Sequence, residues 1–113
     1  MNNMLYDFDL ESVEDVLRIM SEQIRCRRLE RGLSREALSA MSGVPTPTIA
    51  KFEQQSQISL RQYVALAKAL GYKDNLKTVA AEPIYHTMAE LETINQNKTR
   101  QRGRNQFQYQ IEN

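Results

Sequence analysis

Metal sites, disulfides and nucleotide-binding loops all need residues of which this sequence has very few. Its 113 residues include one cysteine, Cys26, one histidine, His86, four glycines and no tryptophan. A single cysteine forms no internal disulfide. The one histidine is far from this cysteine in the sequence, and the two together match neither the spacing of a metal cluster nor that of a Cys-His nucleophile. No glycine-rich loop that could cradle a phosphate is present. We therefore expect no catalytic residue, no metal and no cofactor.

Long apolar stretches are also missing. No run approaches the roughly 18 residues that a membrane span needs. The acidic N-terminal segment lacks the basic and apolar regions of a secretory signal. We expect a cytoplasmic protein that does not associate with membranes. A chain of this length supports one domain with a small appendage.

The charges are nearly balanced in total but are segregated along the sequence. The formal net charge is +1, whereas residues 1–22 carry a net −5 and residues 23–53 and 98–113 carry +3 each. Basic segments of this kind suit a polyanionic partner better than the total charge suggests. A solvated helix face followed by a basic tail accounts for the same charges equally well.

Apolar spacing and capping residues predict a long first helix. Ser12, with Asp15 three residues later, has the pattern of a capping box. The helix is expected to run to about Arg31, where Gly32 supplies a left-handed residue that ends it. Its apolar residues have the spacing of one buried face. They are Val13, Val16, Leu17, Met20 and Ile24.

Three shorter helices are predicted next. Ser34 caps the second helix, which Gly43 breaks, and a short third helix follows. Ser59 caps the fourth, which stops at Gly71. The apolar residues expected to face inward from these helices are Leu38, Met41, Ile49, Phe52, Leu60, Tyr63, Val64, Leu66, Ala67 and Leu70.

The C-terminal third of the sequence is more polar. Residues 74–80 are expected to form a short fifth helix, and residues 81–113 a partly ordered arm with weak helical periodicity. The segment 106–111, QFQYQI, alternates strictly between glutamine and apolar residues. Two interpretations of this segment stay open: a disordered tail, or a short strand that pairs with its twin in a dimer.

The predicted second and third helices have the spacing of a helix-turn-helix, because a tight turn containing glycine joins them, although helical hairpins in general share this spacing. The stretch RRLERGLSREALSAMSGVPTPTIAKFEQQSQISLRQYVALAKALGY resembles the Cro/cI (XRE-type) helix-turn-helix family across about residues 20–76. The matching features are Arg28, Gly32-Leu33-Ser34, Leu38, Gly43-Val44, Ile49, Glu53 and the helix end at 66–71. Ser39 departs from the usual alanine but is still small enough for close helix packing.

This resemblance implies an all-α fold. We expect a small five-helix bundle of the lambda-repressor-like type at residues 12–80, after an acidic extension at 1–11 and before the basic arm at 81–113. It also implies a sequence-specific transcription regulator, a repressor or autoregulator, that binds double-stranded DNA as a homodimer.

Two prolines stand where the recognition helix begins. Because proline has a fixed φ and no N–H, it suits the first turn of a helix and damages the interior. Thr46 is therefore expected to be the N-cap and Pro47 the first helical residue, while Pro45 rigidifies the turn.

The resemblance then implies which side chains touch DNA. It places Thr46, Pro47, Ala50 and Lys51 at base edges, with Lys51 able to reach a guanine edge or a phosphate. Thr48 is expected near the backbone, and Arg35 at the phosphate backbone or an outer base. A turn without base chemistry is the alternative, because few of these side chains can make bidentate contacts.

The resemblance also implies an ion pair between Arg28 and Glu53. This pair would hold the recognition helix at its angle and leave Arg28 partly available to a phosphate. Three further basic residues could contact phosphates or form a solvated helix face. They are Arg25, Arg27 and Arg31.

A weaker resemblance extends beyond the domain. The capped first helix, the proline after residue 80, the polar helix and the KTRQRGRN run look like HipB-type regulators. Those dimeric repressors act as antitoxins beside HipA-type kinases. An antitoxin that binds such a kinase, and a helix-turn-helix adaptor that binds no DNA, are the alternative functions.

Overall fold

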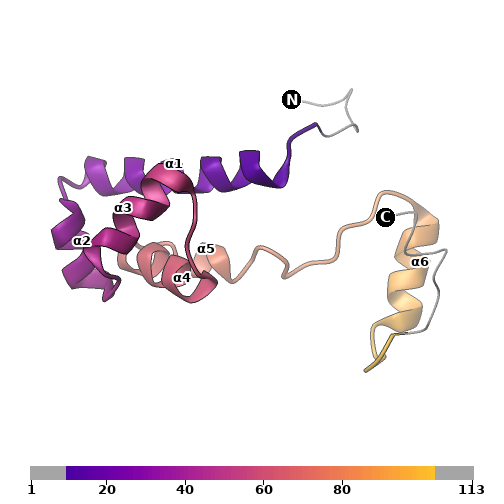
Figure 1. Cartoon of the computed structure of the whole chain (residues 1–113). Helices are drawn as coiled ribbons and strands as arrows, with labels where there is room; N and C mark the ends of the chain where they lie inside the picture. The colour runs from indigo at the N-terminus through magenta and orange to yellow at the C-terminus, as the bar shows by residue number, and fades with distance from the viewer. Residues whose placement is uncertain (1–9, 104–113) are drawn as a thin grey trace. The chain divides into compact units, whose positions relative to one another are not determined.

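The computed structural model describes residues 10–103, and all regular structure in this range is helical. The chain divides into two compact units, with the boundary in the sequence between Val79 and Ala80. Figure 1 shows the helices of each unit. The first contains α1 (Val13–Glu30), α2 (Arg35–Ser42), α3 (Thr46–Gln55), α4 (Leu60–Ala69) and α5 (Lys73–Leu76). The second contains α6 (Met88–Asn97). The predicted all-α class with a five-helix bundle is confirmed, and residues 1–9 and the segment 106–111 lie outside the described range.

Local capping sets where the helices of the bundle begin. The backbone N–H of Asp15 donates to the Ser12 hydroxyl, and the N–H of Ser12 donates to the Asp15 carboxylate, both at 3.0 Å. Ser34 and Ser59 accept from the backbone N–H three residues later, which starts α2 and α4. Each bond satisfies a helix-end donor that has no partner inside the helix.

The core of the bundle lies between α1 and the four shorter helices. Phe52 of α3 packs edge-to-face on Tyr63 of α4, with ring centroids 5.9 Å apart. The remaining core side chains are aliphatic and come from α1, α2, α3, α4 and the turn before α3. The buried set is Ile24, Leu38, Val44, Ile49, Phe52, Leu66, Ala67 and Leu70.

The prediction of one buried face along the whole of α1 is wrong for its N-terminal half. Val13 is 70% exposed, Val16 43% and Leu17 37%, whereas Ile24 is buried. This half of α1 extends past the shorter helices, so it has apolar side chains without a described core beneath them (Figure 1). Met41, Leu60 and Val64, also predicted to face inward, are exposed as well.

The C-terminal unit contains a well-formed helix where the sequence predicts only weak periodicity. Thr87 and Glu90 make a reciprocal capping box at the start of α6. All residues of this helix are exposed or half-buried. None of the helices in residues 10–103 is long and apolar enough to cross a membrane.

Candidate nucleic-acid interface

The turn between α2 and α3 is tightly held. Gly43 ends α2 in the left-handed conformation, with φ 79°, and its N–H donates to the Ser39 carbonyl at 2.8 Å. The N–H of Val44 donates to the Ser42 hydroxyl at 3.1 Å, and the Val44 side chain is buried in the core. The turn therefore fixes α3 against α2.

The recognition helix α3 begins one residue earlier than predicted. Pro45 is the N-cap, with φ −59° and ψ 142°, and Thr46 is the first helical residue. The carbonyl of Pro45 accepts from the N–H groups of Thr48 and Ile49 at 2.9 and 3.1 Å. The backbone of an N-cap residue is non-helical, and its carbonyl accepts the first hydrogen bond of the helix. Proline can meet both requirements, because neither of them uses the N–H group that it lacks. Pro47, in the first turn, removes a donor that would have had no partner inside the helix.

The outward face of α3 carries small side chains and one cation. Pro47 and Lys51 are exposed, and Thr46, Thr48 and Ala50 are half-buried. The buried side of the helix is formed by Ile49 and Phe52.

Gln54 is a candidate that the motif-based prediction missed. It is exposed and lies seven residues after Pro47, so the two side chains share one face of α3. Helical spacing from Pro47 and Lys51 could have identified it. Its amide is suited to a bidentate contact with adenine.

A hollow of about 460 Å³ adjoins this face of α3. It lies between the first turns of α3 and the start of α4, and five of its seven lining residues have polar side chains. The lining residues are Pro47, Thr48, Lys51, Gln57, Ile58, Ser59 and Gln62. The turn from α3 to α4 thus extends the polar surface, and Gln57 and Gln62 were not predicted as part of it.

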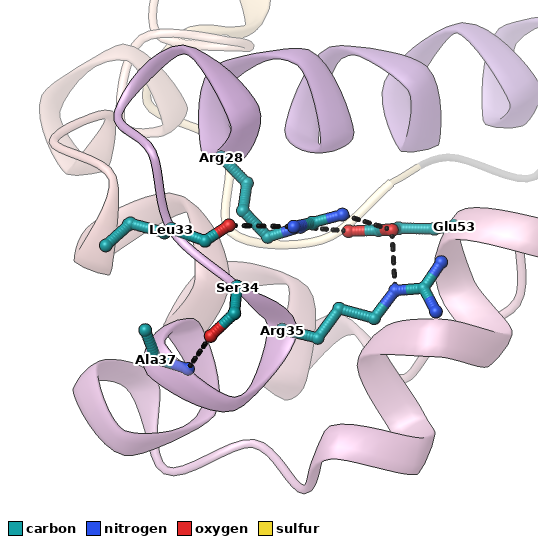
Figure 2. A network of polar contacts seen from close by, with 6 residues as sticks. All are labelled: Arg28, Leu33, Ser34, Arg35, Ala37 and Glu53. Carbon is teal, nitrogen blue, oxygen red and sulfur yellow. Dashed lines mark hydrogen bonds and ion pairs between the residues drawn. The ribbon is translucent and has the colours of Figure 1, made fainter.

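A buried carboxylate connects the helix-turn-helix to α1 (Figure 2). Arg28 of α1 donates from Nε and Nη2 to the two oxygens of Glu53 at 2.7 and 2.9 Å, and from Nη1 to the Leu33 carbonyl at 2.8 Å. The two side chains are 7% and 1% exposed. The predicted ion pair is therefore present as a bidentate contact. With its donors used inside the protein, Arg28 is poorly placed for a phosphate, and its burial argues against the predicted DNA contact.

Arg35 donates to the same carboxylate and shares the oxygen Oε1 with Arg28 (Figure 2). Its Nε donates to Glu53 Oε1 at 3.0 Å, while its side chain is still 33% exposed. This contact was not predicted. Arg35 stands at the first turn of α2. Its contact with Glu53 uses Nε, on one edge of the guanidinium, so N–H groups on the accessible edge can donate to other acceptors.

The charge balance of this cluster favours an ionised carboxylate. Burial alone would raise the pKa of Glu53, but the hydrogen bonds and charges of Arg28 and Arg35 outweigh it and hold that pKa below its ordinary value. Two guanidiniums around one carboxylate leave a net positive charge beside the turn.

Two of the three further arginines considered for phosphate contact, Arg27 and Arg31, have partners within the protein. Arg27 pairs with Glu30 at 2.7 Å, and Arg31 donates to the Ala69 carbonyl at 3.3 Å. Arg25 is exposed. Phosphate contact and a solvated face both stay predictions for these three residues. His86 and Cys26 are exposed as well.

Residues 24–75 match the HTH_3 family of helix-turn-helix domains. The match begins within α1, contains all of α2, the turn and α3, and ends within α5. No curated protein and no solved structure matches the chain. The family match supports a DNA-binding regulator, a class that is generally not enzymatic.

Proposed function

We propose that this chain, whose residues 24–75 form a helix-turn-helix domain of the Cro/cI type, is a repressor or autoregulator that binds operator DNA as a dimer. The observation that carries the proposal is the placement of Arg35, which is one-third exposed and held by Glu53 of α3, next to a helix fixed by a tight turn. A major-groove reader needs a fixed helix that presents small side chains, and cations at its edge for the phosphates.

Arg35 and Lys51 supply the phosphate contacts in this proposal. Arg35 is anchored by Glu53, so less side-chain entropy is lost when its free edge meets a phosphate. Lys51 is exposed on the outward face of α3. Contacts of this kind contribute affinity that is shared by all DNA sequences and falls with salt.

Thr46, Pro47 and Ala50 supply the base contacts, with Thr48 nearer the backbone. Because α3 starts at Thr46, no hydroxyl caps this helix. The Thr46 side chain is thus not committed to the helix end. Its methyl group, the proline ring and the alanine methyl suit a thymine methyl in the major groove.

Titrating the protein with its own upstream DNA and with a scrambled duplex, at two salt concentrations, tests this division of roles. Arg35→Ala is expected to weaken binding to both duplexes and to flatten the salt slope by about one unit. Thr46→Ala is expected to lower the preference for the upstream DNA by roughly 1 kcal/mol. Lys77→Ala is the matched control, since Lys77 is an exposed cation just after α5 and, among the described residues, pairs with exposed Asp74.

Two results would contradict the proposal. If the folded protein binds neither duplex at low salt, an adaptor or an antitoxin that binds a kinase becomes the better interpretation. If Arg35→Ala changes the specificity ratio and Thr46→Ala does not, base reading by the start of α3 is wrong.

A further inference from the structure

The N-terminal half of α1 carries an apolar surface that the described residues leave partly open, with Val13 70%, Val16 43% and Leu17 37% exposed. We call Val13, Val16, Leu17 and Met20 the α1 stripe. They follow helical spacing, Met20 is half-buried and the other three are exposed. The stripe continues on the same side of the helix into buried Ile24, so it extends the core face beyond the core.

The opposite side of this half-helix is polar. Glu14, Arg18 and Glu22 are exposed there, and Arg18 pairs with Asp15 at 3.1 Å. An amphipathic helix with a free apolar side is typical of a surface that buries itself against another helix. The polar side would stay in water in such a pairing, so no charge would be buried.

We infer that the α1 stripe is the surface through which two copies of this chain pair, with their α1 helices antiparallel. The two-fold axis then passes between Val16 and Leu17, the middle of the stripe. In that register Val13 faces Met20 of the second copy and Val16 faces Leu17, reciprocally on both sides. The inference rests on the proposed function in one respect, the separation that operator DNA imposes on the two copies.

The length of α1 supports a second copy as the occupant. A helix rises about 1.5 Å per residue, so Arg28 lies roughly 17 Å from the axis and the two copies of Arg28 roughly 35 Å apart. Each Arg28 holds Glu53 of its own recognition helix. Dimeric helix-turn-helix proteins bind half-sites about 34 Å apart. The same end of α3 also contacts α1 at Ser21, roughly 7 Å from the axis, through the Ser56 hydroxyl. The two recognition helices therefore meet their α1 helices at points roughly 14 to 35 Å apart, and the upper end of this range reaches the separation of one turn of DNA.

Sedimentation of the full chain without DNA tests the surface. The double variant Val16→Asp with Leu17→Asp places charges in the proposed interface and is expected to raise the dimer dissociation constant by at least about a hundredfold. The control replaces two other exposed aliphatic residues, Leu60→Asp with Val79→Asp, and should leave the dimer unchanged. Circular dichroism checks that both variants are folded.

Cross-linking tests the register independently of any loss of folding. In a Cys26→Ser background, Val16→Cys lies beside the axis and is expected to form a linked dimer on oxidation. Arg18→Cys, on the polar side of α1, is expected to stay unlinked.

A wild-type monomer, an intact dimer in the aspartate variant, or equal linking at positions 16 and 18 overturns the inference. The inference is also overturned if the aspartate variant has a lower melting temperature but an unchanged dimer dissociation constant, since another part of the same chain would then cover the stripe. DNA titration separates the two proposals. A protein that dimerises through the stripe but ignores DNA contradicts only the proposed function.

Discussion

At the residue scale, one carboxylate holds together three helices of the helix-turn-helix domain. Glu53 of α3 accepts from Arg28 of α1 and Arg35 of α2, and its side chain is almost inaccessible to solvent. Removing one partner of a buried ion pair costs more than the pair itself contributes, because the remaining charge keeps its desolvation penalty. The orientation of the recognition helix therefore depends on the ionised state of one side chain.

This dependence predicts an acid-labile fold. The pKa of Glu53 is lowered in the folded protein, so below the ordinary value of about 4.3 the unfolded chain binds the proton more readily. The contribution of Glu53 is complete above that pH and is lost as the pH falls through the lowered pKa. Urea denaturation of the wild type from about pH 7 to pH 3 should show this loss. Glu53→Gln should be less stable at neutral pH and show a flatter acid limb, and parallel profiles would contradict the assignment.

Ser56 combines backbone strain with a partly buried hydrogen bond. Its φ is 57°, an unfavourable conformation for a residue with a side chain, and its hydroxyl lies 2.9 Å from that of buried Ser21. Ser56→Ala loses the hydrogen bond and keeps the strain, so the free energy of unfolding should fall by about 1 kcal/mol. Ser56→Gly loses the same bond but removes the strain, and should be more stable than Ser56→Ala. Urea denaturation measures both, and the reverse order would show that the strain is negligible.

At the element scale, local signals predicted helix ends better than helix faces. Ser12, Ser34 and Ser59 act as caps because each bond involves residues three apart in the sequence. The burial of Val13 and Val16 was predicted wrongly, because periodicity shows that a face is apolar but not whether another helix lies against it. Only the packing of the whole bundle decides that.

The start of α3 shows a second limit of sequence patterns. Threonine before proline is a reasonable cap, but the neighbouring Pro45 satisfies the same backbone requirement one position earlier. The outward face of the helix was still predicted, because a shift in the cap does not rotate the residues that follow. The contact of Arg35 with Glu53 could not be read from sequence spacing, because the two residues are 18 positions apart and lie on different helices.

A pair of variants tests the corrected helix start. Ser34 caps α2, so Ser34→Ala should lower the free energy of unfolding by about 1 kcal/mol. Thr46 caps nothing, so Thr46→Ala should leave it within about 0.5 kcal/mol. Thermal melts of both variants provide the comparison, and an equal loss would restore Thr46 as the cap.

At the scale of the whole molecule, dimerisation has two candidate contributors. The segment 106–111 lies outside the described residues, so the strand that its alternation suggests stays a prediction. Deleting residues 105–113 is expected to weaken the dimer in sedimentation, by less than the aspartate substitutions in the α1 stripe. If the deletion changes nothing, the stripe is sufficient. If the deletion alone abolishes the dimer, the tail is the main interface.

The 18 residues of α1 form one unbroken helix, which links the α1 stripe to Arg28, the residue that holds the recognition helix through Glu53. Each residue inserted between the α1 stripe and Arg28 would move Arg28 by about 1.5 Å along the helix and rotate it by roughly 100° around the helix axis. Adding one full turn would restore the angle and, counted over both copies, lengthen the assembly by about 11 Å, or roughly three base pairs. The length of α1 would then select the operator spacing, so homologous chains with a longer α1 should recognise half-sites that are further apart.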